Sequence, residues 1–391
     1  MMAQSSEISR GLRAIIFFII FVFVCRNSLY TDDLPIIHYA FSAMRFACWA
    51  IVLMLYFRSP QRIDALGFFM LLYGVVVTYS SFTMQSDSKF SVLSIGFDVF
   101  MIWCLFRLYL PQCAQLILES FITSLAVCIY INFILLLLYP NGIRGWFLLG
   151  GNYNQMGRTL IPAIAIHGFY TLQYGKKKLS FIALSTISLL TVLYVGSKTS
   201  TVGLVLLLIF YFVRSAQIRK WIFISFISVY IIFQIFTVFM PQDLSENEYI
   251  TYFVEEVLHK DLTFTNRSTV WAKTILLIAD SPIYGYGHRA PDWFSNLLHV
   301  KTTHNQILHV LIMGGFIALS IFITQIVLAI KSYAKNRNIA TQFLFFGLCT
   351  FFFMMIMETY NYTYIALLLL ILYNIKDFVS NYEETIEQQP Q

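Results

Sequence analysis

Charged side chains are scarce in this sequence. Only 12% of its 391 residues are Asp, Glu, Lys or Arg, whereas 58% are hydrophobic. A soluble domain of this length does not carry that much apolar surface, so the composition excludes a soluble globular protein and indicates a polytopic membrane protein. The formal net charge of +6 is spread over short loops and forms no continuous basic patch, which argues against a nucleic-acid partner.

Cysteine and metal-ligand patterns are also missing. The 6 cysteines lie in or at the ends of apolar segments, so an external disulfide framework is not expected. The sequence also contains no CxxC motif that would indicate a metal site. The acids Asp32-Asp33 and Glu255-Glu256 are adjacent pairs without ligand spacing, and the outer histidines show no zinc pattern. The sequence therefore predicts neither a metal nor another cofactor.

Long apolar windows, by contrast, fill most of the chain. A membrane-spanning helix needs about 20 mostly apolar residues. The windows that approach this length are 13–30, 37–57, 64–83, 90–110, 113–139, 156–173, 180–196, 199–214, 221–240, 305–330, 340–358 and 361–376. They predict an all-α polytopic membrane protein of about twelve transmembrane helices, with residues 1–391 forming a single membrane domain. The first window lacks a small-residue cleavage site and is expected to stay as an uncleaved helix.

The distribution of Lys and Arg predicts the orientation. An even number of spans puts both termini on one side, and cytoplasmic loops carry the excess of Lys and Arg. With the N-terminus inside, the short outer segments hold only Arg26, Lys89, Arg144, Arg158 and Lys198. Both termini are therefore expected to be cytoplasmic. The long loop 241–303, between the ninth and tenth spans, faces outward and forms a small helical cap, with helices expected at 246–258 and 268–279.

Ionisable residues also occur within the apolar windows. Arg45, Asp98, Arg107 and Glu119 fall in or near predicted spans, where a charge normally faces a partner or a cavity. Arg45 and Asp98 are candidates for a pair. Such a pair would be structural or would line a substrate groove, and both interpretations stay open.

The most reactive combination of side chains lies between residues 266 and 318. Arg267 supplies a permanent positive charge outside the membrane, and His304 stands at the outer end of the next apolar segment. That position leaves the imidazole hydrated, as a general base working near neutral pH requires. A guanidinium binds two oxygens of a diphosphate at once. The alternatives are an interfacial histidine and a solvated loop arginine without any chemical role.

This stretch resembles a known family. His304-Asn305, followed after nine residues by Gly315, is similar to the histidine motif of the O-antigen ligase and polysaccharide polymerase (Wzy-type) superfamily. Arg267 and the glycine turn 281–287 are similar to the arginine helix and the turn that precede this motif.

One position departs from the family pattern, because Ala318 stands where Gly, Thr or Tyr is common. The departure is mild, since small residues are interchangeable inside an apolar helix. The resemblance implies a multi-pass glycosyltransferase of the bacterial cytoplasmic membrane with an extracytoplasmic active site. His304 would deprotonate or orient the acceptor hydroxyl, and Arg267 would hold the diphosphate. Transfer would invert the anomeric carbon and need no metal.

The resemblance also implies the partners. Undecaprenyl-diphosphate-linked oligosaccharides would serve as donor and acceptor, within the membrane lipids, and a chain-length regulator protein would be a further partner. The candidate substrate-binding residues are Lys198, Arg158, Arg144, Asn154, Asn305 and Gly285. Lysine at position 198, where related proteins commonly carry arginine, keeps a point charge but loses bidentate phosphate recognition. For the asparagines and the lysine, ordinary helix capping and a plain polar turn are the alternatives.

Three functions are compatible with these patterns. The first is polymerisation of lipid-linked repeat units into a capsule, an exopolysaccharide or O-antigen. The second is ligation of the glycan to lipid A core or another surface acceptor. The third, from another class, is a flippase for the same lipid-linked unit. The sequence favours the polymerase by resemblance, and it disfavours the flippase because no internal repeat is visible and the outer cations lie near one surface.

Overall fold

The computed structural model describes residues 10–31, 34–59, 61–86, 89–143, 145–239 and 263–379, and it is all-helical as predicted. Every apolar window of the sequence lies largely within one of its helices. In chain order these are α1 (Arg10–Ser28), α2 (Pro35–Arg58), α3 (Ala65–Thr83), α4 (Lys89–Leu138), the 3-10 turn η1 (Tyr153–Gln155), α5 (Gly157–Tyr174), α6 (Lys178–Tyr194), α7 (Lys198–Phe212), α8 (Ala216–Phe239), α10 (Thr263–Asp280), α11 (Pro291–Leu298), α12 (Gln306–Lys335), α13 (Ile339–Met354) and α14 (Tyr362–Tyr373).

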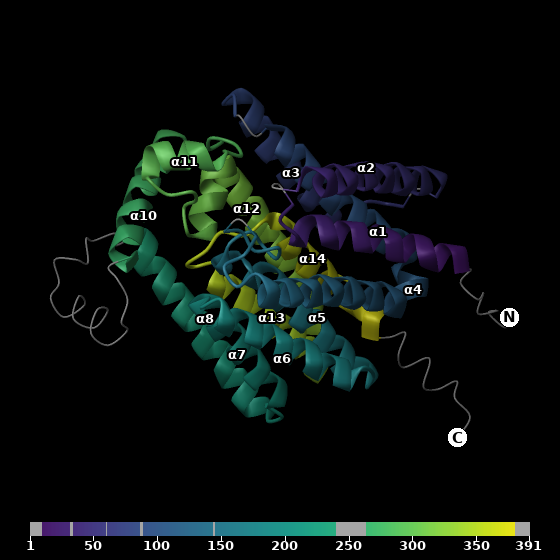
Figure 1. Cartoon of the computed structure of the whole chain (residues 1–391). Coiled ribbons are helices and arrows are strands. Elements are labelled where there is room, and N and C mark those ends of the chain that lie inside the picture. The colour runs from purple at the N-terminus through teal and green to yellow at the C-terminus, as the bar shows by residue number, and fades with distance from the viewer. Residues whose placement is uncertain are drawn as a thin grey trace, which may run out of the picture.

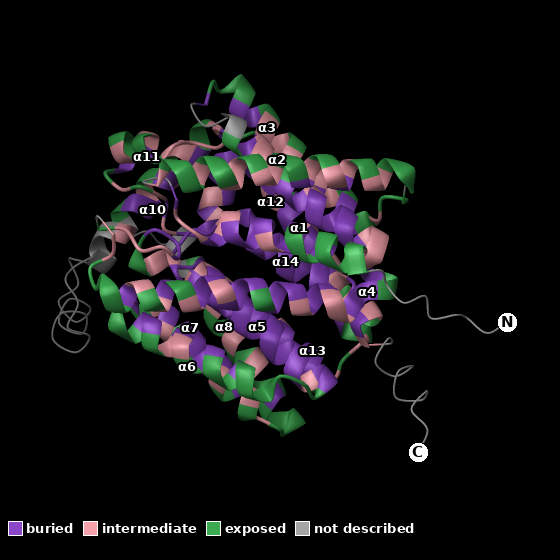
Figure 2. Ribbon diagram, turned by 45° about the vertical axis from the view of Figure 1, so that its right-hand side comes forward, coloured by how far each residue is buried: buried purple, intermediate pink, exposed green. Residues whose placement is uncertain are grey.

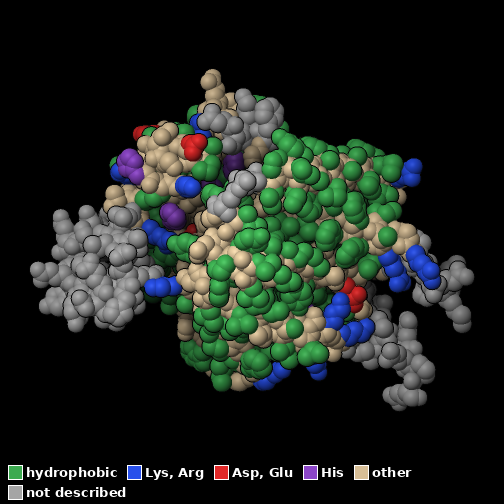
Figure 3. Space-filling view, viewed as in Figure 1, with side chains coloured by type: hydrophobic (Ala, Val, Ile, Leu, Met, Phe, Trp, Pro, Cys, Tyr) green, Lys and Arg blue, Asp and Glu red, His purple; other side chains and the backbone are tan. Residues whose placement is uncertain are grey.

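The helices have the lengths and composition of membrane spans. Within the described ranges, 6 of them, namely α1, α2, α3, α4, α8 and α12, are long and apolar enough to cross a membrane, while α6, α7, α13 and α14 are apolar but shorter. Figure 3 shows hydrophobic side chains over most of the bundle's visible face, with Lys and Arg toward its ends. The chain is therefore an all-helical membrane protein.

The centre of the bundle is formed by α5, α13 and α14 (Figure 2). Nearly all residues of α5 and α14 are buried, as are most residues of α13. Small residues let these helices approach closely, as in other membrane bundles. A Cβ added at Gly168 would overlap the Phe343 ring, and one at Gly347 would overlap Ala165. The outer helices α2 and α8 bury only 11% of their apolar windows, so their exposed apolar faces are available to lipid.

Two predicted spans, 90–110 and 113–139, appear as the single element α4. Its backbone leaves helical geometry at Cys113, just after Pro111, where the proline removes a backbone donor. Ser91, near its start, lines a cavity with Asn152, and Asn132, near its end, accepts a hydrogen bond from Leu149 N at 2.8 Å. Both ends of α4 thus lie beside the same loop, the one between α4 and α5. The element folds back at the proline, as two separate windows require (Figure 1).

The helix α12 is broken in its first half at Gly314 and Gly315. The turn 281–287 fills this break: Tyr286 N donates to Ile312 O at 2.6 Å, and Phe316 N donates to Pro282 O at 2.8 Å. Backbone groups freed by a broken helix at membrane depth need such partners, because lipid offers none. The glycine turn and the Gly315 end of the histidine motif are therefore two halves of one packing unit.

The first and last helices and the predicted cap lie at opposite ends of the bundle. In Figures 1 and 2, α1 begins and α14 ends at one end of the bundle, whereas α10 and α11 lie at the other. The predicted helix 268–279 is found as α10, which ends at Asp280. The predicted helix 246–258 lies outside the described residues.

A buried charge pair joins α2 to α4. Arg45 Nη1 lies 3.8 Å from Asp98 Oδ2, which confirms the pairing suggested by the sequence. Trp49 and Asn27 donate further hydrogen bonds to the same carboxylate, at 3.0 and 3.3 Å. These partners compensate a carboxylate that is 1% exposed and would otherwise be costly to bury.

Candidate functional site

The candidate site begins where the chain enters α12. Asn305 caps this helix, because its side-chain oxygen accepts hydrogen bonds from Ile307 N at 3.0 Å and Leu308 N at 3.2 Å. Its amide nitrogen donates to Gln234 Oε1 at 3.1 Å, and the residue is fully buried. His304, immediately before the cap, has φ 51°, a left-handed conformation that persists only where the surroundings impose it. The cap thus fixes the direction of the histidine.

The loop between α13 and α14 is bonded to the same helix end. Gln306 N donates to Met355 O at 2.9 Å, and Tyr360 N donates to Gln306 Oε1 at 2.8 Å. Glu358 stands between these anchors, with a side chain only 3% exposed. Burial, and then the charge of Glu358, raise the pKa of Tyr360 well above its ordinary value of 10.0, so this phenol stays protonated. The loop therefore places one buried carboxylate, that of Glu358, beside the start of α12.

The third contribution comes from α10. Arg267 and Trp271 are one turn apart and share a face of this helix. Trp271 Nε1 donates to Thr303 O at 3.1 Å, which ties α10 to the residue before His304. Arg267 Nη2 lies 3.1 Å from Glu358 Oε1, at ion-pair distance. The structure thus brings Arg267 and His304, the two predicted catalytic residues, to the same carboxylate.

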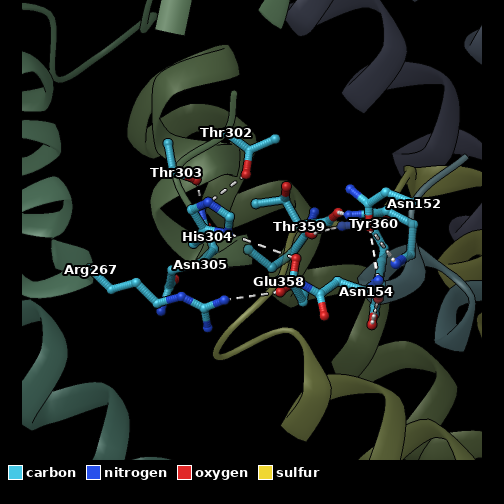
Figure 4. Close-up of polar contacts among 12 residues, drawn as sticks. Asn152, Asn154, Arg267, Thr302, Thr303, His304, Asn305, Glu358, Thr359 and Tyr360 are labelled. Carbon is cyan, nitrogen blue, oxygen red and sulfur yellow. Dashed lines mark hydrogen bonds and ion pairs between the residues drawn. The ribbon is translucent and has the colours of Figure 1, made fainter. Parts of the chain in front are cut away.

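His304 completes the arrangement on the other oxygen of that carboxylate. Its Nδ1 lies 3.8 Å from Glu358 Oε2 (Figure 4). Nδ1 itself is buried, whereas the side chain as a whole is 24% exposed, so the exposed part of the ring lies at its other edge. The order is therefore arginine, glutamate, histidine, with the glutamate in the middle.

This order has a clear chemical use. A carboxylate beside Nδ1 favours the tautomer with its proton on that nitrogen and stabilises the imidazolium that forms when Nε2 takes a proton. Arg267, at ion-pair distance, orients the carboxylate. The three residues together can therefore remove a proton from a hydroxyl group at the exposed edge of the imidazole.

Glu358 was not among the residues that the sequence singled out. It lies at the end of a predicted span, 340–358, and is separated from His304 by a long stretch of apolar helix. One signal marks it: between Arg337 and Lys376 it is the only charged residue. An isolated acid in an otherwise uncharged stretch of a membrane protein is a functional-site candidate by default.

A cavity of about 370 Å³ opens beside these residues. Its mouth is polar and includes Asn152, Gln155 and Thr302, whereas its interior between α3 and the first half of α4 is apolar, with Val77 and Val99 among its lining residues. Burial lowers the pKa of His288, a further lining residue, so its imidazole is neutral near pH 7. The cavity can accept a molecule with one polar and one apolar end.

The other predicted substrate-binding residues differ in their position relative to this site. Arg158 lines the cavity. Asn154 sits in η1, where its carbonyl accepts a hydrogen bond from Tyr360 Oη at 3.5 Å. Lys198 is exposed in the first turn of α7 and is not among the lining residues. Arg144 lies outside the described residues.

Asn305 and Gly285 have structural contacts in this arrangement. The Asn305 side chain is taken up by the cap of α12 and by Gln234. Gly285 has φ 62°, and a Cβ there would overlap the carbonyl of Ile312 in the broken part of α12. Gly285, predicted to bind substrate, therefore packs closely against the backbone of α12.

No metal centre is visible in the part of the chain that the structure describes, where no three His, Cys, Asp or Glu side chains are grouped to hold an ion. The polar atoms of the site are instead one carboxylate, one imidazole and several cationic or neutral groups. Fold and site together define a class: a multi-helix membrane protein with an acid–base pair and a cationic, amphiphilic cavity at one end of its bundle.

Comparison with known proteins agrees with this class. Residues 183–323 match the family model described as O-antigen ligase (Wzy_C), a segment that runs from α6 into α12 and includes Arg267, His304 and Gly315. No curated protein matches the chain. The match confirms the resemblance indicated by the histidine motif. The similarity covers this segment, which is less than half of the chain. Glu358 and Arg158 lie outside the matched segment.

Proposed function

We propose that this protein polymerises undecaprenyl-diphosphate-linked oligosaccharide repeat units into a surface polysaccharide at the outer face of the cytoplasmic membrane. The observation that carries the proposal is the contact of Arg267 and His304 with one buried carboxylate, Glu358, next to a cavity with a polar mouth and an apolar interior. An acid–base pair beside such a cavity suits sugar transfer from a lipid carrier.

The proposed reaction is one direct displacement. A hydroxyl of the acceptor glycan attacks the anomeric carbon of the donor while its proton passes to His304 Nε2. The bond between that carbon and the diphosphate oxygen breaks, and the lipid diphosphate leaves with the bonding electron pair. Glu358 stabilises the imidazolium, and outer cations stabilise the charge on the leaving group. The anomeric carbon is inverted, and no metal takes part.

The proposed membrane arrangement follows from the sequence and the helix ends. We infer that the shorter helices α5, α6, α7, α13 and α14 span the membrane together with the longer ones, giving about twelve spans when the two halves of α4 are counted separately. The end that carries α10 and α11 is the extracytoplasmic one, and both termini are cytoplasmic.

Within this family the polymerase is preferred to the ligase. The turn 197–200, the glycine turn 281–287 and the run 304–306 resemble those of capsule and exopolysaccharide polymerases, whose acceptor is a second lipid-linked repeat unit. The ligase would transfer a finished glycan to lipid A core or another surface acceptor. A flippase would have no use for an acid–base pair at one end of its bundle.

The decisive experiment measures polymer size in a deletion strain that carries His304→Ala or Arg267→Ala. Single-repeat products with normal amounts of protein in the membrane are expected for both variants, because proton removal and the orientation of Glu358 are lost. Lys273→Ala is a matched control, since Lys273 is an exposed cation on the same helix as Arg267.

The products separate the three functions. Single repeats on the outer surface indicate a polymerase, and long lipid-linked polymer that is not attached to its acceptor indicates a ligase. Lipid-linked units retained inside indicate a flippase. Wild-type polymer from both variants would refute the proposed chemistry.

A further inference from the structure

Asn361 stands at the N-cap of α14 but does not cap this helix. Asparagine at such a position normally accepts a hydrogen bond from a backbone N–H of the first turn. Asn152, Asn305 and Asn338, at the N-caps of η1, α12 and α13, do so. The Asn361 side chain makes no cap hydrogen bond, and its amide has no other partner among the described residues. Because Asn361 lines the cavity, its amide can donate to and accept from a molecule bound there.

The position of Asn361 is fixed by the loop that carries Glu358. Thr359 and Tyr360 separate the two residues in the chain, and Figure 4 shows them leading away from Glu358. Tyr360 N donates to Gln306 Oε1 at 2.8 Å, which ties this loop to the first turn of α12. Asn361 is therefore held on the cavity wall close to the Glu358 carboxylate.

His309 is a second group of this kind. It follows Gln306 by three residues, so the two lie one turn apart on the same face of α12. The His309 ring lines the cavity and packs against Phe294, with ring centres 5.7 Å apart. Its Nδ1 is buried and has no hydrogen-bond partner in the described part of the chain. Buried polar atoms are seldom left unpaired, so this nitrogen also indicates a missing partner.

Tyr73, on α3, is the third. Its ring stacks on that of Tyr362, the residue after Asn361, with ring centres 4.5 Å apart. Tyr73 lines the cavity and is only 4% exposed, yet its hydroxyl has no hydrogen-bond partner among the residues that the structure describes. Leaving a buried hydroxyl unpaired is costly. Three uncharged polar groups, from α3, α12 and the start of α14, thus lack partners around one cavity.

These groups indicate the chemistry of a ligand. A hydrocarbon chain would leave all three unpaired, whereas few polar groups set among apolar and aromatic side chains suit an uncharged polar molecule. A sugar has this character, because its ring carries several hydroxyl groups and also apolar C–H faces. The sugar that presents the attacking hydroxyl must lie beside His304, the proposed base. In the proposed reaction this is the terminal sugar of the acceptor.

We propose that Asn361, His309 and Tyr73 form the subsite for the terminal sugar of the acceptor glycan. The inference rests on the proposed function, for which it names the acceptor subsite. The Asn361 amide binds a hydroxyl or acetamido group of this sugar, and His309 and Tyr73 bind its other polar groups. A site built to hydrogen-bond a substrate hydroxyl rejects sugars that lack it. Asn361 is therefore a specificity-determining residue, which selects the repeat unit that is extended.

The test is binding of the methyl glycoside of the repeat-unit oligosaccharide to the purified full-length protein in nanodiscs. This probe has no diphosphate and can act only as an acceptor. Asn361→Ser and Tyr73→Phe are expected to weaken its binding about five- to tenfold, because each removes a hydrogen bond. The thermal midpoint should not fall, since serine is as good an N-cap as asparagine and the Tyr73 hydroxyl has no protein partner to lose.

A matched control and a shortened probe identify the contact. Asn338→Ser changes an asparagine that caps α13 and does not line the cavity, so it should leave binding unchanged. The methyl glycoside without its terminal sugar should bind weakly and equally to wild type and Asn361→Ser. In polymer formation, Asn361→Ser should raise the substrate concentration for half-maximal rate and leave kcat close to wild type.

Three results would overturn the assignment. The first is unchanged binding in both Asn361→Ser and Tyr73→Phe, which would mean that water alone pairs with these groups. The second is a loss confined to the undecaprenyl-diphosphate-linked repeat unit, which would assign the subsite to the donor. The third is the absence of saturable binding of the methyl glycoside to the wild-type protein.

The acceptor subsite and the proposed chemistry can fail separately. His304→Ala should bind the methyl glycoside as wild type does while failing to form polymer, because binding needs no proton transfer. A His304→Ala variant that still makes polymer refutes the catalytic proposal, and the binding data alone then decide the acceptor subsite.

Discussion

Glu358 connects two side chains that lie far from it in the chain. It is 3.1 Å from Arg267 and 3.8 Å from His304, and its own side chain is almost completely buried. A buried carboxylate between a permanent cation and an imidazole is stabilised by the first and controls the tautomer of the second. At the scale of single residues, the proposed chemistry therefore needs this glutamate as much as the two residues that the motif marks.

Glu358→Gln tests this dependence. The amide keeps the size of the side chain but removes its charge, so the imidazolium formed during proton transfer is no longer stabilised. We expect the rate of polymer formation to fall about 100-fold or more, with little change in the substrate concentration for half-maximal rate. An in vitro assay with lipid-linked repeat units separates the two quantities.

Glu358→Asp provides the control for this prediction. It retains the charge on a shorter side chain and should recover part of the rate. If Glu358→Gln and Glu358→Asp are equally impaired at normal protein levels, charge is not the property that matters.

At the scale of elements, the interruption of α12 organises the end of the bundle that carries α10 and α11. Gly315 has φ 61°, and a Cβ there would overlap the carbonyl of Ile283 in the turn 281–287. The same turn packs against α3, where a Cβ at Gly287 would overlap the backbone of Ser81. The turn thus fixes α12 relative to α3, and with it one wall of the cavity.

Gly315→Ala should therefore destabilise the folded protein. The left-handed backbone costs about 1–3 kcal/mol for a residue with a side chain, and the overlap with Ile283 adds to it. The thermal midpoint of the purified protein in detergent is the measurement.

Gly175→Ala is the matched control for Gly315→Ala. Gly175 also has a positive φ, of 69°, but a Cβ there meets nothing within 4 Å. It should lose only the part of the stability that comes from backbone strain. Equal losses in the two variants would show that the packing of the turn contributes nothing.

At the scale of the whole molecule, the helices form one bundle with the candidate site at a single end. The carboxylate, the imidazole and the cavity mouth all lie near the end that carries α10 and α11, whereas α1 begins and α14 ends at the other (Figure 1). A site confined to one membrane surface suits a substrate that is presented on that side only.

The orientation of this bundle can be tested by labelling. Cysteine at position 273, on α10, should react in intact cells with a membrane-impermeant maleimide, whereas cysteine at position 178, at the start of α6, should react only after permeabilisation. Both native side chains are exposed lysines, and the native cysteines are buried or partly buried, so background labelling is low. The reverse pattern would place the site in the cytoplasm.

The sequence predicted the elements well because each helix is encoded locally. Apolar windows of the right length mark where helices lie, and Pro111 marks where α4 folds back. The sequence also marked Arg267 and His304, which stand in a recognisable motif and which the structure brings to one carboxylate. Their catalytic roles stay predictions. The sequence could not rank Asn305 or Gly285, since a polar or flexible residue has the same appearance whether it binds a substrate or packs against a neighbouring helix.

The sequence by itself thus determined the all-helical membrane class, the family resemblance and the end of the bundle where chemistry is expected. Only the tertiary structure decided that Glu358 joins Arg267 to His304, that Asn305 is used as a cap, and that Asn361 lines the cavity instead of capping α14. The physical reason is the range of the interactions. Hydrophobic periodicity acts within a single helix, whereas a charge and its partner meet across helices whose packing no local pattern records.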